Sequence, residues 1–242
     1  MTYYKNVCII PAKFNSTRLK NKNILKLGKK TLLENTIKKA INSKLFDKII
    51  VNTESTKIIK KLRFIKQIEI IKRPNYLSKD PYTISDVVLF SLRKLNKAKI
   101  NFEHTCILLP TSPFFLVKDI TSAFKVFNKK KPNCLVSISK NNFPPYNSYL
   151  MDKKMNLNFC FQDSRYKNKK STECPITYKS NGGIMIIKNK VFLKHKKIHS
   201  LKKIGFESKK WSFIDIDQFD EYLLSKIIFE KYYKKDSKNF YV

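Results

Sequence analysis

Two neighbouring carboxylates near the end of the chain are the first candidates for chemistry, and the chemistry they suit is metal binding. Asp215 and Asp217 stand in an Ile-Asp-Ile-Asp run that predicts a strand over residues 213–216. Side chains two residues apart on a strand face the same side, and hard carboxylate oxygens suit Mg²⁺. The chain has 18 acidic residues against 51 basic ones, so such a pair is less expected by accident. We expect Mg²⁺ at this pair, with an acidic strand end that holds no metal as the alternative.

A basic loop follows the first apolar run and is the candidate phosphate site. Residues 11–23 carry four cations and several amide or hydroxyl side chains, among them Lys13, Arg18, Lys20, Lys22, Asn15, Ser16, Thr17 and Asn23. A triphosphate needs such a cluster of donors and positive charges. The loop after the first strand of an open α/β sheet is also where phosphates usually bind. A solvated loop is the alternative, because lysine is frequent everywhere in this chain.

Six elements, in order along the chain, resemble the CMP-sialic acid synthetase (acylneuraminate cytidylyltransferase) family. They are Ile9-Ile10-Pro11-Ala12 with Ser16, Lys22 and Asn23; Leu45-Phe46-Asp47 with Val51-Asn52-Thr53-Glu54; Arg73-Pro74 with Leu77 and Asp80; Leu109-Pro110-Thr111-Ser112-Pro113; Asn181-Gly182-Gly183; and Ile214-Asp215-Ile216-Asp217. The matches extend from residue 7 to about residue 230. Six ordered elements are far more specific than any one of them.

The resemblance implies an enzyme that transfers CMP from CTP to the anomeric hydroxyl of an acidic nonulosonic sugar and releases pyrophosphate. Neuraminic, legionaminic and pseudaminic acids are the acceptors of this type, and the product would serve surface glycan synthesis. The implied catalytic residues are Lys22, Asp215 and Asp217, with both aspartates on Mg²⁺. The implied substrate- and nucleotide-binding positions are Ala12, Lys13, Asn15, Ser16, Arg18, Asn23, Arg73, Asp80, Pro110, Thr111, Ser112, Lys179 and Asn181.

The resemblance also assigns roles that these side chains can perform. Lys13 and Lys22 would neutralise the phosphates, and Asn23 would hydrogen-bond their oxygens, as would Ser16. Arg73 can donate to the carbonyl oxygen of cytosine. A surface arginine before a proline turn is the alternative for Arg73. Asp80 would support the nucleotide, and Asn181 would contact the sugar.

Several positions depart from the family pattern, mostly on the sugar side. Lys13 replaces the usual arginine, which keeps the charge but loses the bidentate fork. Leu109 stands for a glutamine, Phe115 and Lys179 each stand for an arginine, and Ser171-Thr172 stands for Arg-Gln. We therefore expect CMP transfer more firmly than any particular acceptor. A related sugar nucleotidyltransferase, for example one for 3-deoxy-manno-octulosonate, is the alternative function, and a non-catalytic relative is a further one.

The elements that must position these residues follow from the spacing of apolar side chains. Strands are predicted at residues 7–11, 48–51, 68–71, 105–109, 135–138, 182–187 and 213–216, and helices around residues 32–41, 87–95, 120–127 and 222–230. Their alternation predicts a single three-layer α/β/α domain over residues 1–242, with a mostly parallel, Rossmann-like sheet. Ligands then bind beyond the carboxyl ends of the strands. Gly182 and Gly183, two of the four glycines, predict a position where the backbone approaches a ligand or bends sharply.

Residues of about 140–178 break this pattern and predict an inserted arm. Short strands are expected at 149–155, 157–162 and 167–172. The resemblance makes this arm the dimerisation segment of a homodimer, and aromatic residues in it could form the interface. A cap on the same subunit is the alternative. The basic tail over residues 232–242 is expected to be loosely held.

The net charge of +33 admits nucleic acid, anionic membranes or anionic small substrates as partners. The lysines are spread along the whole chain, which favours a solvated basic surface, and there is no RNP-type, zinc or recognition-helix motif. We therefore expect no nucleic acid and no membrane as partners. No apolar run approaches the ~18 residues of a membrane helix, and the start of the chain shows no cleavage site. Five cysteines without C-x-x-C spacing indicate reduced thiols in the cytoplasm.

Overall fold

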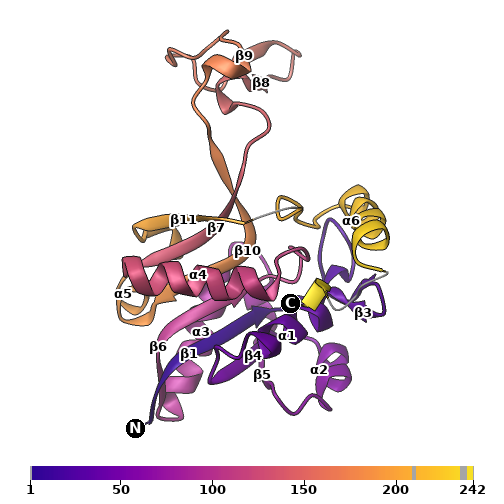
Figure 1. Cartoon of the computed structure of the whole chain (residues 1–242), viewed down its shortest axis with the longest axis vertical. Coiled ribbons are helices and arrows are strands. Elements are labelled where there is room, and N and C mark those ends of the chain that lie inside the picture. The colour runs from indigo at the N-terminus through magenta and orange to yellow at the C-terminus, as the bar shows by residue number, and fades with distance from the viewer. Residues whose placement is uncertain (1, 209–210, 235–238, 242) are drawn as a thin grey trace.

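Seven strands form the central sheet in the part of the chain that the computed structural model describes, residues 2–208, 211–234 and 239–241. Their order is β11-β7-β10-β6-β1-β4-β5, and β10 is antiparallel to both neighbours whereas the other adjacent pairs are parallel. The strands are β1 (Thr2–Pro11), β4 (Lys48–Thr53), β5 (Glu69–Lys72), β6 (Ile100–Leu108), β7 (Cys134–Lys140), β10 (Tyr178–Lys188) and β11 (Lys203–Glu207). The predicted mostly parallel α/β sheet is confirmed (Figure 1).

Helices cover both faces of this sheet. Successive residues of a strand point to opposite faces, so each helical layer packs against its own set of strand residues. Cys8 and Ile10 pack with α1, α2 and α4, whereas Val7 and Ile9 pack with α3 and α5. The helices are α1 (Leu32–Ser43), α2 (Thr56–Leu62), α3 (Ile84–Lys97), α4 (Val117–Lys130), α5 (Asn189–His195) and α6 (Phe219–Tyr232). Within the described residues, none of these helices has the length and apolar character needed to span a bilayer.

Short 3-10 turns and a small hairpin complete the body of the molecule. The turns are η1 (Lys22–Ile24), η2 (Asn75–Ser78), η3 (Pro145–Asn147), η4 (Ser171–Glu173), η5 (Ile198–Ser200) and η6 (Asn239–Tyr241). The hairpin pairs β2 (Lys26–Leu27) with β3 (Lys30–Thr31) directly after η1. It therefore joins the basic loop to the start of α1.

Between β7 and β10 the chain leaves the sheet and forms an arm over residues 141–177 that projects far from the body (Figure 1). Its tip holds β8 (Tyr149–Met151), paired antiparallel with β9 (Leu157–Phe159). Both strands end earlier than predicted. After β8 the Asp152 carboxylate accepts the N–H groups of Lys154 and Asn156 at 2.8 and 2.9 Å, which turns the chain.

The predicted strand over residues 167–172 is wrong. Ser171–Glu173 forms the turn η4 instead, and the Lys170 N–H donates to Glu173 Oε2 at 3.0 Å. A carboxylate that binds a backbone N–H three residues earlier stabilises a helical turn rather than a strand.

The predicted strand over residues 213–216 is also wrong, although the alternation that suggested it is real. Ile214 and Ile216 are buried, but this stretch is a turn followed by chain without a sheet partner. It is held instead by the Ile216 N–H, which donates to the carbonyl oxygen of Thr111 at 2.7 Å. The aspartate pair therefore lies on a loop packed against the end of β6.

The expectation of a loosely held tail is wrong for residues 239–241. Phe240 is fully buried against Phe114 and Phe229, and the Tyr241 hydroxyl donates to Asn35 Oδ1 at 2.6 Å. These contacts belong to a third apolar cluster, formed by the hairpin, α6 and the turn after β6. Residues 235–238 and 242 of the tail lie outside the described residues.

Candidate functional site

A cleft opens beyond the carboxyl ends of the parallel strands, the edge at which such sheets bind ligands. One part of it, of about 200 Å³, is lined by predicted site residues, which are Lys13, Lys22, Asn23, Arg73, Asp80, Pro110 and Thr111. An adjoining hollow of about 430 Å³ shares Lys13 and Asp80 with it and adds Asn15. The fold thus gathers residues as far apart in the sequence as Pro11 and Thr111 around one space.

Two cations of the basic loop converge on one carboxylate from the far end of the chain. Lys22 Nζ lies 2.5 Å from Asp217 Oδ1, and Arg18 Nη2 lies 2.6 Å from Asp217 Oδ2. The start of α6 fixes the backbone of Asp217, because the Glu221 carboxylate accepts the Asp217 N–H at 2.7 Å. The loop and the acidic run, separated by 195 positions, therefore form one charged cluster at the cleft.

Asp215 lies beside this cluster with one oxygen buried and unsatisfied. Its Oδ1 has no hydrogen-bond partner, although it is shielded from solvent. Burial raises the pKa of the Asp215 carboxyl, and the neighbouring Asp217 charge adds to this, while the Thr111 hydroxyl and Lys22 oppose it. Leaving such an oxygen unpaired is costly, and a cation is one partner that would satisfy it.

The unpaired oxygen of Asp215 fits a position beside a divalent cation, whereas both oxygens of Asp217 are paired with Lys22 and Arg18. No group of three or more His, Cys, Asp or Glu side chains suited to a metal occurs among the described residues. Mg²⁺ commonly binds through one or two carboxylates and takes its other ligands from water and substrate phosphates. Mg²⁺ at Asp215 and Asp217 therefore stays a prediction.

The turn after β6 and the glycine pair of β10 form one wall behind the aspartates. Gly182 has φ +70°, and a Cβ there would lie 3.1 Å from Ser112 Oγ and 3.4 Å from Asp215 Oδ2. Ser112 Oγ also donates to the carbonyl oxygen of Asn181 at 2.7 Å. The register of β10 against β7 shifts at this point. The backbone at Gly182 thus closely approaches protein atoms, and the predicted approach to a ligand stays a prediction.

Asn181 is buried in this wall, with 2% of its surface exposed. Its Oδ1 accepts the Ser137 hydroxyl at 2.5 Å and the Gly183 N–H at 3.2 Å, whereas its Nδ2 has no partner. The carbonyl end of the side chain is thus committed to the protein. Any sugar contact, as the resemblance implies, would fall to Nδ2.

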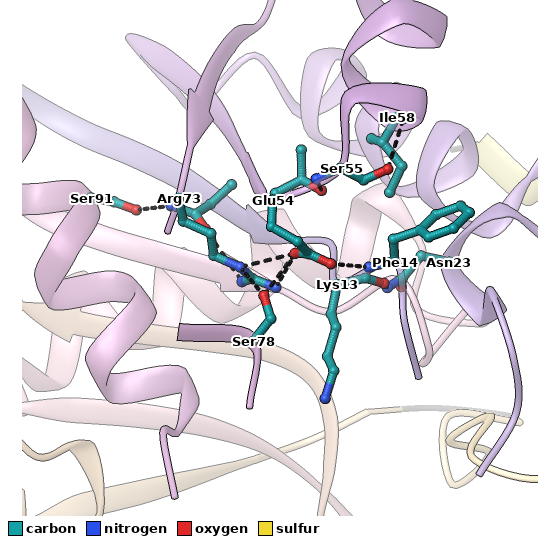
Figure 2. A network of polar contacts seen from close by, with 11 residues as sticks. Lys13, Phe14, Asn23, Glu54, Ser55, Ile58, Arg73, Ser78 and Ser91 are labelled. Carbon is teal, nitrogen blue, oxygen red and sulfur yellow. Dashed lines mark hydrogen bonds and ion pairs between the residues drawn. The ribbon is translucent and has the colours of Figure 1, made fainter. Parts of the chain in front are cut away.

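Arg73 is buried in a polar network at the side of the cleft, shown in Figure 2, with its side chain 3% exposed. Its Nε and Nη2 lie 3.2 and 3.0 Å from Glu54 Oε2, its Nε lies 2.9 Å from Ser78 Oγ, and its Nη1 lies 3.3 Å from Asn52 Oδ1. Three of its nitrogens are therefore bound to the protein. Arg73 is therefore not a surface arginine, and its guanidinium group is not wholly free to bind cytosine.

Glu54 is the centre of this network, although no role was predicted for it beyond its place in a motif. Its Oε1 accepts the Phe14 N–H at 2.7 Å, so it fixes the basic loop as well as Arg73 (Figure 2). Burial alone would raise the pKa of the Glu54 carboxyl, but the hydrogen bonds from Phe14 and Ser78 and the Arg73 charge outweigh it and lower that pKa. Sequence reasoning could have found Glu54 because it is an acid directly after a strand of a parallel sheet, in a chain with few acids.

The rest of the loop is held by contacts to main-chain atoms. Within the described residues, the Lys13 side chain takes no part in these contacts. The Ala12 N–H donates to the Asn52 carbonyl oxygen at 2.8 Å, and Asn23 Nδ2 donates to the Lys13 carbonyl oxygen at 2.6 Å. The Lys13 side chain points away from the Glu54 network (Figure 2). Ser16 Oγ is buried without a partner. Asn23 thus orients the loop, and Lys13 is available to an anion in the cleft.

Some predicted positions lie away from the cleft. Lys179 is exposed on β10 at the base of the arm and is not part of the cleft lining, and Ser171-Thr172 lies in η4 within the arm. Phe115 is buried in the core, whereas Leu109 lines the cleft. Of the departures on the sugar side, Leu109 is the one that lines the cleft, and Lys13 is the departure on the nucleotide side that does so.

Comparison with protein families decides the class of the chain. The family model described as cytidylyltransferase matches residues 7–225. The chain belongs to this family. The match covers the basic loop, the turn after β6 and the aspartate pair, so the relationship predicted from six ordered motifs is confirmed.

Named cytidylyltransferases with different acceptors are similar to the chain. N-acylneuraminate cytidylyltransferase of Escherichia coli O18:K1:H7 is 29% identical over 94% of this chain and 52% of that protein. Pseudaminic acid cytidylyltransferase of Campylobacter jejuni serotype O:2 is 24% identical over 93% of this chain and 97% of that protein. CMP-N,N'-diacetyllegionaminic acid synthase of Legionella pneumophila is 30% identical over 80% of this chain and 82% of that protein. The chain therefore spans about half of the E. coli relative and almost all of the C. jejuni one.

Solved structures share the fold at low sequence identity. A CMP:2-keto-3-deoxy-manno-octonic acid synthetase complexed with CTP has a TM-score of 0.69 and 13% identity, covering 94% of this chain and 99% of that one. A 4-diphosphocytidyl-2C-methyl-D-erythritol synthase from Anaerococcus prevotii has a TM-score of 0.66 and 14% identity, covering 93% and 98%. These likenesses show the same α/β architecture.

Proposed function

We propose that the chain transfers CMP from CTP to the anomeric hydroxyl of an acidic nonulosonic sugar, with release of pyrophosphate. The observation that carries this proposal is the convergence of Arg18 and Lys22 on Asp217, beside Asp215, at the edge of the cleft. Cations that can bind a triphosphate and carboxylates that can bind Mg²⁺ meet there, as nucleotidyl transfer requires. Membership of the cytidylyltransferase family supports CTP as the donor.

In this mechanism the chain positions reactants and neutralises charge rather than forming a covalent intermediate. Lys13, Lys22 and Arg18 bind the triphosphate, and Asp215 and Asp217 hold Mg²⁺. Bound Mg²⁺ supplies positive charge to phosphate oxygens and stabilises the charge that develops on them. The anomeric oxygen forms a bond to the α-phosphorus while the bond from that phosphorus to the bridging oxygen breaks, and pyrophosphate leaves.

The acceptor class rests on the relatives, which are named for neuraminic, pseudaminic and legionaminic acids. Leu109, which replaces a glutamine of the family pattern, lines the cleft. It offers no hydrogen bond to a sugar. We therefore propose only the class of acceptor. A screen of candidate sugars identifies the particular sugar. Five free cysteines support a reducing compartment, and we propose the cytoplasm.

The test follows pyrophosphate release with CTP and a panel of nonulosonic acids and 3-deoxy-manno-octulosonate. We expect turnover that needs Mg²⁺ and that falls by about 100-fold or more in Asp217→Asn, since this removes a charge from the metal and loop cluster. Asp220→Asn, at an exposed acid in the first turn of α6, is the matched control and should be unchanged. Turnover with another nucleotide and not with CTP would refute the donor. Full Mg²⁺-dependent activity in Asp217→Asn would refute the metal assignment, and CTP binding without any turnover would favour a non-catalytic relative.

We also propose that the chain is a homodimer joined through the arm. The arm exposes apolar side chains, which are Phe143, Tyr149, Leu150, Met151, Met155, Leu157, Phe161 and Ile176. Exposed apolar groups gathered on one small element are typical of an interface. Light scattering should give the mass of a dimer, and Leu150→Lys should give the mass of a monomer, whereas the exposed Lys125→Ala on α4 should remain dimeric. A monomeric wild type would refute the proposal.

A further inference from the structure

A second cavity lies outside the cleft, between the β2–β3 hairpin, α1 and α6. Its volume is about 610 Å³, and none of its lining residues lines the cleft. Half of its twelve lining residues are lysines, whereas lysine and arginine together make up 51 of the 242 residues of the chain. This cavity, named the hairpin pocket below, is therefore much more basic than the chain as a whole. The lysines are Lys26, Lys29, Lys30, Lys38, Lys226 and Lys234.

The positive charge of the hairpin pocket is largely uncompensated. Glu230 is its one acidic residue among the described lining residues, and it pairs with Lys234 at 3.9 Å. Lys26 and Lys29 have no ion pair within the described part of the chain. Several ammonium groups around one concavity repel each other unless an anion neutralises them. The pocket thus has the electrostatics of an anion site.

Apart from the lysines, the lining of the hairpin pocket is mainly apolar and aromatic. Leu27, Phe229, Tyr222 and Tyr241 contribute to it. Gly28 packs closely on the ring of Phe229, because a Cβ at this position would lie only 2.4 Å from it. A flat ring can pack on such aromatic surfaces, while phosphate groups bind lysines at the rim. Inorganic phosphate alone would make no contact with the apolar and aromatic lining residues.

We propose that the hairpin pocket is a second binding site for a small phosphorylated ligand that carries a planar ring, of the nucleoside phosphate class. Its concave shape and volume of about 610 Å³ suit a small molecule rather than an extended nucleic acid strand. The pocket also touches both elements that hold the charged cluster of the cleft. The hairpin begins at Lys26, four residues after Lys22, and the Tyr222 hydroxyl of α6 donates to the Lys26 carbonyl oxygen at 2.8 Å.

The test is calorimetric titration of the full chain with CTP, and with CMP, cytidine and inorganic triphosphate as separate probes. Wild type should bind CTP at two sites. A pocket variant, Lys26→Glu with Lys29→Glu and Lys226→Glu, should lose one site or weaken it by about tenfold or more. Cytidine and triphosphate should each bind this second site more weakly than CTP does.

The matched control carries the same change of charge on exposed lysines of α3 and α4, as Lys94→Glu with Lys125→Glu and Lys129→Glu. It should keep both sites, since only general attraction to a basic protein is reduced. Equal loss in both triple variants would overturn the proposal, as would a single site in wild type or two unchanged sites in the pocket variant. Should the glutamate variant unfold, the corresponding triple alanine variant gives the same comparison. An oligonucleotide that binds the pocket more tightly than CTP would overturn the small-ligand assignment.

The proposal is separable from the proposed function. Lys22→Ala disables the cleft but leaves the hairpin pocket intact, so this variant should retain the second site while turnover falls. Failure of turnover with every acceptor would leave the calorimetric result in place, and failure of the second site would leave turnover in place.

Discussion

Replacing Glu54 with glutamine should destabilise the fold more than any other loss of one charge near the cleft. The Glu54 and Arg73 side chains are 9% and 3% exposed, and their closest atoms lie 3.0 Å apart. Glutamine keeps the shape and can still accept the Phe14 N–H, but it leaves the guanidinium buried without a counter-charge. Removing one partner of a buried pair costs ~3–5 kcal/mol. Because Ser78 and Asn52 still bind Arg73, we expect the lower end, about 3 kcal/mol.

The same pair predicts how the loss depends on pH. Burial would raise the pKa of the Glu54 carboxyl, yet its hydrogen bonds and Arg73 bring that pKa below its ordinary value. The unfolded chain then binds the proton more readily than the folded one. The stabilisation is therefore fully present above the ordinary carboxyl pKa and is lost as the pH falls through the lowered folded value. The gap between wild type and Glu54→Gln should close over that acidic range.

The assay is urea unfolding followed by circular dichroism, at neutral pH and at stepwise lower pH. Glu69→Gln is the control, because Glu69 pairs with Lys48 but half of its side chain is exposed. An exposed pair of this kind contributes less than about 1 kcal/mol. Equal losses in the two variants, or a gap for Glu54→Gln that does not change with pH, would refute the reasoning.

Three further predictions concern Gly182, Lys39 and Cys134. Gly182→Ala places a Cβ 3.1 Å from Ser112 Oγ at a positive φ. We expect this variant to lower kcat/KM and to lower the free energy of unfolding by about 1–2 kcal/mol. Unchanged values in kinetics and urea unfolding would contradict this. Lys39→Met leaves the Pro113 carbonyl oxygen, 2.5 Å from Nζ, without its buried donor and should cost about 1–3 kcal/mol in urea unfolding. Burial lowers the pKa of Lys39, so wild type should gain stability relative to this variant as the pH rises toward the ordinary lysine pKa, and a constant difference would be the contrary result. Burial raises the pKa of Cys134 to about 11, so a thiol reagent followed by mass spectrometry should label this residue only after unfolding, and labelling of the folded protein would disprove its burial.

The order and type of the main elements could be predicted from the sequence, because they depend on local periodicity. Val7 and Ile9 alternate with Cys8 and Ile10, which requires a strand buried on both faces, and the structure packs the two sets against different helices. The glycine at residue 182 was likewise predictable as a close approach, since a positive φ is costly for other residues. Both inferences need only the chain near the residue concerned.

Elements whose stability depends on a distant partner were not predictable in this way. Ile214 and Ile216 alternate with aspartates as in a strand, but β11 already occupies the edge of the sheet beside β7. The segment therefore packs as a loop. The buried tail residue Phe240 follows the same logic, because its burial depends on Phe114 and Phe229.

The candidate site divides along the same line. By itself the sequence determined which residues are available: cations after the first strand, two carboxylates near the end, and ordered motifs that place the chain among the cytidylyltransferases. Only the tertiary structure decided that Arg18 and Lys22 meet Asp217 from the other end of the chain, and that Glu54 rather than a ligand neutralises Arg73. The physical reason is that residue types follow from the sequence, whereas ion pairing requires atoms within a few ångströms, a distance that the packing of the sheet, α6 and the loops sets.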